Sequence, residues 1–129
     1  MTIRWLSKKV VLAIHNEQLK EHGGLIGIRD EGLLDSALSR PKNRLIYEET
    51  KNIIELASSY GFAIVRNHPF IDGNKRTAFV SAATFLSLNG YQLQAPQQSV
   101  VNVFSKLAAR EIDEDDLTRW FKKYSNLNH

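Results

Sequence analysis

Residues 66–76 read Arg-Asn-His-Pro-Phe-Ile-Asp-Gly-Asn-Lys-Arg, and this polar stretch separates two long apolar segments. Before it, from about Lys51 to Asn67, aliphatic and aromatic residues recur around most of the circumference of a helix. After it, Lys75 to Asn89 repeats that character. A helix that is apolar nearly all round lies inside a core rather than on its surface. We therefore expect two central helices that pack together, joined by a loop that packing alone does not require.

The chain before these helices predicts two further ones. Residues 3–6 alternate weakly and predict a short extended segment, and Ser7 is a suitable N-cap for the first helix. Apolar residues then follow at helical spacing until Gly23-Gly24 ends the pattern. This helix holds His15 and His22, seven apart in the sequence. No third ligand is spaced to join them in a metal site, so we interpret both as ordinary surface or boundary histidines.

The second of these helices follows a short connector over residues 25–29. Asp30 can cap it, and Pro41 is expected to stop it because proline disfavours helical continuation. Residues 41–50 have no periodicity and are polar with scattered apolar side chains. They predict a surface loop or a short hairpin.

Two more helices are expected after the central pair. Asn89-Gly90 supplies a left-handed stop, after which Tyr91 and Leu93 can fold back on the last turn. Pro96 opens the next helix. Asp113 caps the last one, whose acidic residues 114–116 suit the positive end of the helix dipole and need no metal to explain them. The sequence thus predicts one domain over residues 1–129, an all-α bundle of about six helices with at most a short strand or flap.

Composition restricts the environment and the partners. The chain has 129 residues and no cysteine, which excludes disulfides and thiolate metal sites. No segment resembles a signal peptide or approaches the ~20 apolar residues of a membrane span. We therefore expect a cytoplasmic protein without membrane contact. The net charge of +3 is small and dispersed, so direct nucleic-acid binding is not expected.

The polar stretch carries groups suited to an anion. Gly73 and Asn74 lie where a loop becomes a helix N-terminus, whose free N–H groups bind phosphates. Lys75 and Arg76 follow in the first turn, where cations oppose the helix dipole and an anionic guest would compensate them. Alternatively, Gly73 only relieves a tight turn and the two cations extend into water.

Two further residues complete a nucleotide-phosphate site. Asp72 offers a hard oxygen ligand, and one carboxylate beside bound phosphates is enough for Mg²⁺. His68 lies four residues earlier and can take a proton from a hydroxyl as general base. Pro69 and Phe70 are expected to anchor the loop. A lone histidine is usually structural, but this one leaves an apolar helix directly into a polar loop.

Residues 68–76 resemble the signature of the Fic/Doc family, and the Asn-Lys-Arg ending resembles its Doc (death-on-curing) branch. The similarity extends to residues 22–34, Arg40-Pro41, residues 85–91 and Trp120. It implies an all-helical Fic fold and transfer of part of ATP to a protein hydroxyl. Fic proteins generally move AMP, whereas Doc-like toxins bind ATP in a reversed sense and transfer the γ-phosphate.

The resemblance also implies roles for single residues. His68 would be the general base and Asp72 the carboxylate linked to Mg²⁺, while residues 41–50 would correspond to the Fic flap that presents the target segment. The implied phosphate-binding residues are Gly73, Asn74, Lys75, Arg76 and, as a match to an arginine associated with the Doc site, Arg66.

Four positions distinguish the two branches. Lys75 and Phe79 stand where Fic proteins have glycine and a second arginine, and both departures occur in Doc-like toxins. Pro69 and Gly73 are more Fic-like.

The resemblance implies partners as well. A small Phd-like antitoxin would hold the toxin inactive through a C-terminal helix lying in a groove beside the site. The target implied for a Doc-like toxin is a threonine of elongation factor Tu, whose phosphorylation arrests translation. Three alternatives remain open at this point: an adenylyltransferase, a ribonuclease toxin, and a non-catalytic module that binds an antitoxin.

Overall fold

Two antiparallel helices, α3 (Ile53–Asn67) and α4 (Asn74–Leu88), form the centre of the molecule. The computed structural model describes residues 2–48, 50 and 52–128. Most residues of α3 are buried, including Tyr60 and Ile64, and the inner face of α4 buries Phe85 and Leu86. The prediction of two central helices that pack together is confirmed, with boundaries that differ by one or two residues; Lys51 lies outside the described residues.

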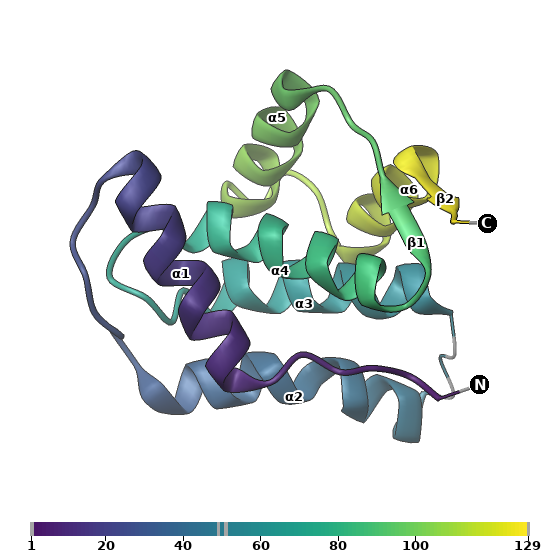
Figure 1. Cartoon of the computed structure of the whole chain (residues 1–129), viewed down its shortest axis with the longest axis horizontal. Coiled ribbons are helices and arrows are strands. Elements are labelled where there is room, and N and C mark those ends of the chain that lie inside the picture. Colours follow the sequence, from purple (N-terminus) through teal and green to yellow (C-terminus); the bar gives the residue numbers. More distant parts are fainter. Residues whose placement is uncertain (1, 49, 51, 129) are drawn as a thin grey trace.

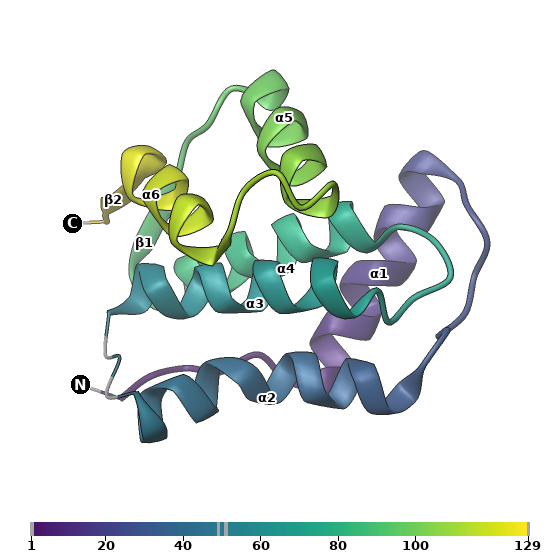
Figure 2. The ribbon, with the colours of Figure 1, turned by 180° about the vertical axis from the view of Figure 1, so that it is seen from behind.

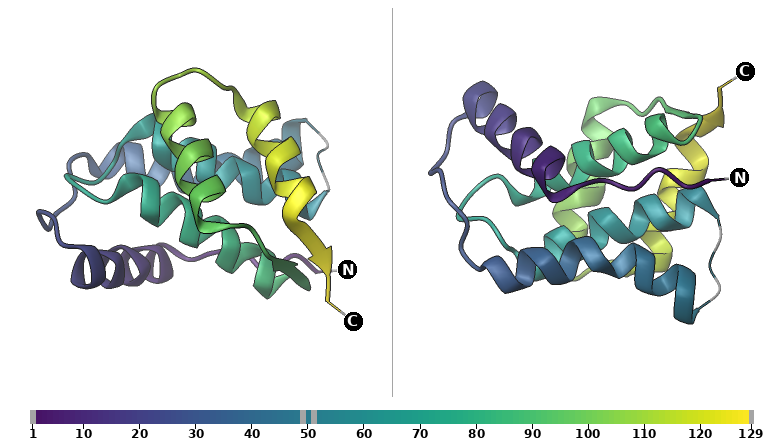
Figure 3. Two further views of the ribbon diagram at one scale, coloured as in Figure 1. Left: turned by 90° about the horizontal axis from the view of Figure 1, so that it is seen from above. Right: turned by 60° about the horizontal axis from the view of Figure 1, so that its bottom comes forward.

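Four helices and two short strands surround this pair. α2 (Glu31–Tyr47) packs along α3, while α1 (Lys8–His22) crosses α4 (Figure 1). On the other side lie α5 (Gln97–Ala108) and α6 (Glu114–Tyr124), as the views from behind and above show (Figures 2 and 3). Strand β1 (Tyr91–Leu93) pairs antiparallel with β2 (Ser125–Leu127). The all-α class with six helices and little strand is confirmed for the described residues.

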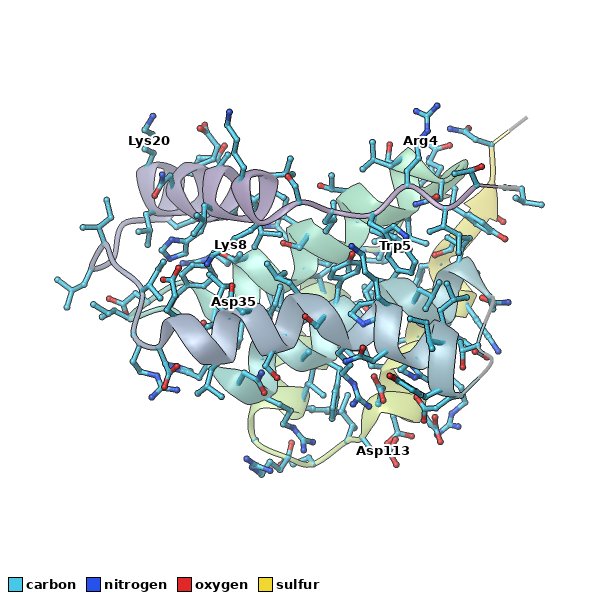
Figure 4. All side chains as sticks on the ribbon, turned by 90° about the horizontal axis from the view of Figure 1, so that it is seen from below. Arg4, Trp5, Lys8, Lys20, Asp35 and Asp113 are labelled. Carbon is cyan, nitrogen blue, oxygen red and sulfur yellow. The ribbon has the colours of Figure 1, made fainter. Side chains whose placement is uncertain are left out.

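Helix caps explain where the elements begin. The hydroxyl of Ser7 accepts from Val10 N–H, and the carboxylate of Asp30 accepts from Leu33 N–H at 2.9 Å. Asp113 and Asp116 form a reciprocal capping box at α6. Each cap satisfies backbone donors that a helix N-terminus leaves without an intrahelical partner. These starts are those that the sequence predicted. At the N-terminus of α1, Lys8 contacts Glu31 and Asp35, which ties α1 to α2 (Figure 4).

Pro41 does not stop α2, contrary to the prediction. The helix continues to Tyr47 with Pro41 buried inside it. Proline costs a helix one hydrogen bond, and tertiary contacts can outweigh that cost. Here Arg40 binds Glu114, and Arg44 donates to Ser59 at 2.6 Å, so two cations hold the helix on both sides of the proline.

Residues 41–47 are therefore helical rather than a loop or hairpin. They lie at the end of the molecule where α3 begins, whereas the polar stretch of the sequence follows the other end of α3 (Figure 1). With 1.5 Å of rise per residue, α3 separates the two ends by ~22 Å. The expectation that residues 41–50 act as a flap over the site is thus wrong for residues 41–48 and 50, while residue 49 lies outside the described residues. Within the described ranges, no helix is long and apolar enough to cross a membrane.

Candidate functional site

The site is built on residues 68–73, which we call the motif loop and which join α3 to α4. His68 ends α3 in the left-handed conformation (φ 48°, ψ 55°), a position that glycine usually takes. Pro69 and Phe70 are buried behind it, as expected for anchors. The chain therefore turns sharply at His68 and leaves its imidazole exposed to solvent.

Asn74 closes the motif loop from inside. Its Oδ1 accepts from Phe70 N–H at 3.0 Å, and its Nδ2 donates to Phe70 O at 2.9 Å. The side chain is buried and both ends of its amide are occupied. Any contact of Asn74 with a phosphate is therefore left to its backbone N–H, not to the side chain.

Replacing Asn74 with alanine should destabilise the protein strongly. The change leaves a buried N–H and a buried C=O of Phe70 without partners, and each such loss costs ~1–3 kcal/mol. We expect the free energy of unfolding to fall by ~2–4 kcal/mol in urea titrations followed by circular dichroism. Asn52→Ala, which removes an exposed cap, provides a comparison with an expected loss of ~1 kcal/mol. Equal losses in the two variants would contradict the role assigned to Asn74.

A second chain segment, residues 24–30, lies alongside the motif loop. Pro69 O accepts from the N–H groups of Arg29 (2.7 Å) and Asp30 (3.1 Å), and Gly27 O accepts from Ile71 N–H (3.1 Å). From the sequence, residues 25–29 of this segment were predicted to be only a short connector. The glycines of this segment were the signal that the sequence offered. The structure explains one of them, because Gly27 has φ +133° and a Cβ there would lie 2.9 Å from Ile71 Cδ1. Residues 24–30, rather than 41–50, are thus the segment beside the site.

Arg29 fixes the end of α3. Its Nε donates to His68 O at 2.7 Å, and its Nη2 donates to Asn67 O at 2.9 Å. A cation at this position satisfies terminal carbonyls and lies at the negative end of the helix dipole. Arg29 therefore holds the backbone that carries the exposed imidazole.

His15 supports the motif loop from α1. It is only 3% exposed, its ring stacks on Phe70 with centroids 3.8 Å apart, and its Nε2 lies 2.8 Å from Asp72 O. Because the carbonyl can only accept, Nε2 donates this hydrogen bond. The interpretation of His15 as a surface or boundary residue was wrong. Its helical spacing from the buried Val11 was the available signal. His22 is exposed, as expected.

Asp72 is partly buried and oriented by the neighbouring segment. Its Oδ2 accepts from Leu25 N–H at 2.7 Å, and a Cβ added at Gly24 would lie only 3.2 Å from Asp72 Cβ. The described residues contain no group of three or more histidine, cysteine, aspartate or glutamate side chains that could hold a metal. A single oriented carboxylate fits Mg²⁺ only in the form that shares its ligands with substrate phosphates and water.

A cavity of ≈ 690 Å³, which we call the α4 cavity, opens at the N-terminus of α4. Gly73 has φ +78° and supplies no side-chain cap, so the first N–H groups of the helix remain available. Lys75 and Arg76 are exposed and line the cavity. Its volume lies within the ~300–1,000 Å³ typical of ligand pockets. The walls comprise Gln18, Glu21 and His22 from α1, residues 73–76 with Phe79 and Val80 from α4, and Ala95, Gln97, Val100, Val101, Phe104 and Ser105.

Arg66 lies apart from these phosphate-binding candidates. It lines a different cavity, between α2 and α3, and its Nη2 donates to Ile112 O at 3.2 Å. The reason is that Arg66 belongs to α3, where its guanidinium lies over the ring of Phe62 and lines the cavity toward α2, whereas Lys75 and Arg76 begin α4. The structure thus brings Gly73, Asn74, Lys75 and Arg76 together around one cavity. The other predicted site residues, Arg66, His68 and Asp72, are not among the residues that line it.

Comparison with known proteins identifies the family. Residues 5–86, well over half of the chain, match the model of the Fic/DOC family. The chain belongs to the Fic/Doc family. The matched range includes α1 to α3, the motif loop and α4 as far as Leu86. Helices α5 and α6, with the α5 wall of the α4 cavity, lie beyond it.

Two Doc proteins are similar to this chain over most of its length. Over 91 residues it is 37% identical to "Protein kinase doc" of Escherichia phage P1, covering 70% of this chain and 72% of the relative. Over 98 residues it is 36% identical to "Toxin Doc" of Mycolicibacterium smegmatis, covering 74% and 75% respectively. The Fic/Doc protein described here is therefore a Doc-like member of the family.

Phe79 is the residue for which the sequence resemblance predicts a difference between the Fic and Doc branches. It lines the α4 cavity one turn after Lys75, and its ring packs edge-on against Phe104 at 5.7 Å and Trp120 at 6.3 Å. This side of the cavity is therefore apolar and supplies no cation to a phosphate.

Proposed function

We propose that this protein is a Doc-like toxin kinase that transfers the γ-phosphate of ATP to a hydroxyl of a target protein. The observation that carries the proposal is the α4 cavity, where free N–H groups of a helix N-terminus meet two exposed cations. Lys75 and Arg76 have no salt bridge among the described residues. Because the helix dipole disfavours them there, a polyanionic guest would stabilise both.

The phosphates of ATP would bind at the start of α4. Backbone N–H groups from Gly73 onward would cradle them, and the side chains of Lys75 and Arg76 would donate to their oxygens. Phosphoryl transfer places little covalent demand on the protein, so positioning and charge stabilisation would supply most of the rate. Asp72 would hold Mg²⁺ together with these phosphates, and the ion would neutralise charge that develops on their oxygens.

His68 would act on the protein substrate. Its exposed imidazole would take the proton of the target hydroxyl while that oxygen bonds to the γ-phosphorus. The bond from the γ-phosphorus to the bridging oxygen would break, and ADP would leave. Arg29 would keep His68 in place through the backbone of α3, and His15 and Asn74 would keep the motif loop rigid.

Transfer of AMP by the same site is the nearest rival. It requires an attack at the α-phosphorus and firm contacts to the α- and β-phosphates. The apolar surroundings of Phe79 favour γ-transfer, because the cation that would contact those phosphates in a Fic protein is replaced by a ring.

A toxin of this kind would have an antitoxin partner. The apolar side of the α4 cavity, with Phe79, Val80, Val100 and Val101, is a suitable surface for an amphipathic helix of a Phd-like antitoxin. Val101 is 52% exposed there, so the apolar side of the cavity reaches the surface of the molecule. A helix in this groove would also lie across Lys75 and Arg76 and would exclude ATP. As the protein target we propose elongation factor Tu, at a threonine, with arrest of translation as the result.

Two parallel labelling reactions test the proposal. We expect the purified protein, incubated with bacterial lysate and Mg²⁺, to transfer label from γ-labelled ATP to one protein band, with none from α-labelled ATP. Label from the α position alone would establish adenylyl transfer instead. RNA degradation without ATP would support a ribonuclease, and absence of both labels together with tight antitoxin binding would support a non-catalytic module. Purified elongation factor Tu, added to the same reaction, tests the target directly.

A further inference from the structure

The cavity beside Arg66 has a composition of its own. It measures ≈ 390 Å³ and lies between α2 and α3, separate from the α4 cavity. The described cations that line it are Arg40, Arg44 and Arg66, and we therefore call it the arginine cavity. The face of the molecule on which α2 lies is seen in Figure 4.

Two of the three arginines are already paired with carboxylates. Arg40 makes a forked contact with Glu114, with Nε at 3.1 Å and Nη2 at 2.5 Å from its two oxygens. Arg44 contacts Glu48 at 3.0 Å and Glu114 at 3.5 Å. Glu48 and Glu114 therefore balance the charges of Arg40 and Arg44.

Arg66 is the cation left over. No described carboxylate pairs with it, its Nη2 donates only to Ile112 O, and its Nε is buried without an acceptor. A partly buried guanidinium without a counter-charge is unfavourable, and a carboxylate is the group whose geometry matches its donors. Counted over the described residues, the arginine cavity thus has one positive charge in excess and an incomplete set of hydrogen bonds.

The rim of this cavity suits a protein partner rather than a small ion. The ring of Phe62 lies beneath the guanidinium groups of both Arg40 (5.3 Å) and Arg66 (4.8 Å). At the other end of the cavity Tyr47 is 81% exposed, next to Ile46 at 66%. Tyrosine and arginine are the residue types enriched in the centres of protein–protein interfaces.

The position of the cavity relates it to the exposed imidazole. Arg66 and Asn67 line it, and His68 is the next residue along the chain. Arg29 fixes the carbonyls of both Asn67 and His68, so the end of the cavity and the imidazole are held in one rigid unit. A polypeptide that brings a hydroxyl to His68 and continues along α2 would lie over the arginine cavity.

We propose that the arginine cavity binds an acidic segment of the target protein, with a glutamate or aspartate of that segment paired to Arg66. The inference rests on the proposed function, because it assigns the cavity to the protein that receives the phosphate. It adds to the proposed function a class of protein substrate, in which the residue that receives the phosphate has acidic neighbours in the sequence. It also separates two binding sites, with nucleotide in the α4 cavity and the protein segment along α2 and α3.

A binding assay tests this without any need for catalysis. The probe is a fluorescein-labelled peptide with one threonine among glutamates, and a second peptide has glutamine in place of each glutamate. We expect fluorescence anisotropy to report binding of the acidic peptide and at least ~10-fold weaker binding in Arg66→Gln. Arg66→Lys should bind with intermediate affinity because it keeps the charge and loses the forked donors. Tyr47→Ala, at an exposed position, should weaken binding without any effect on the fold.

Lys20→Gln is the matched control, since it removes the same charge at an exposed position on α1 that points away from the molecule (Figure 4). ATP binding, measured separately, should be unchanged in Arg66→Gln, and this distinguishes failure of the inference from failure of the proposed kinase activity. Equal weakening in Lys20→Gln would reduce the effect to net charge and overturn the proposal. The proposal would also be overturned if the glutamine peptide bound as tightly as the acidic peptide, or if RNA displaced the acidic peptide.

Discussion

His68→Asn should lower the rate of phosphate transfer by ~10²–10⁴-fold, the usual contribution of a positioned general base. Without the imidazole, Asp72 is the other proton acceptor among the side chains of the motif loop, and the proposal assigns this carboxylate, oriented by Leu25 N–H, to Mg²⁺ rather than to the target hydroxyl. Asparagine is chosen because His68 has φ 48°, a conformation that asparagine tolerates far better than alanine. The rate is measured as incorporation of γ-label into the target protein.

The control for this variant is its binding of nucleotide. Gly73 to Arg76 are untouched, so affinity for ATP should stay within about twofold of the wild type, and the thermal midpoint should change little because the replaced side chain is exposed. His68→Gly keeps the left-handed backbone as well and should be equally inactive. A variant that retains more than a tenth of the rate would mean that His68 is not the base.

The sequence predicted the framework of this site well for physical reasons that are visible in single residues. Ser7, Asp30 and Asp113 are caps, and a cap acts on N–H groups two or three positions away in the same chain. The central helices were recognisable because helical spacing and burial are also local patterns. Gly73 was correctly placed at a loop-to-helix junction on the same grounds.

What the sequence could not predict depends on contacts between distant residues. Pro41 stays inside α2 because Arg40 and Arg44 reach Glu114 on α6, more than 60 positions along the chain. The spacing of His15 from Val11 could indicate a buried face of α1, but it does not predict that the partners of His15 are Phe70 and Asp72, which lie more than 50 positions along the chain. The separation of Arg66 from Arg76 likewise follows from the direction of α3 in the assembled fold.

The double variant Lys75→Gln/Arg76→Gln should lose affinity for ATP by ~10²–10⁴-fold. Each charge-assisted hydrogen bond contributes ~1.5–3 kcal/mol, and 1.4 kcal/mol corresponds to a factor of ten. The same change should leave the free protein slightly more stable, by ~0.3–1 kcal/mol per residue, because both cations oppose the helix dipole and neither has a salt bridge in the described chain. Isothermal titration with ATP and Mg²⁺ measures the first effect, and urea denaturation the second.

A binding site predicts that the α4 variant loses affinity for ATP while the free protein gains stability, and this combination is what makes the prediction specific. Lys122→Gln/Lys123→Gln removes the same charge from the C-terminal turn of α6, where cations are favourable to the dipole. That control should be slightly less stable and should bind ATP normally. If the α4 cations served only to solvate the surface, their removal would raise stability in the same way but leave ATP affinity unchanged. The change in stability follows from the helix dipole alone, so unchanged affinity for ATP in the α4 variant would refute the phosphate site whether or not the stability rises.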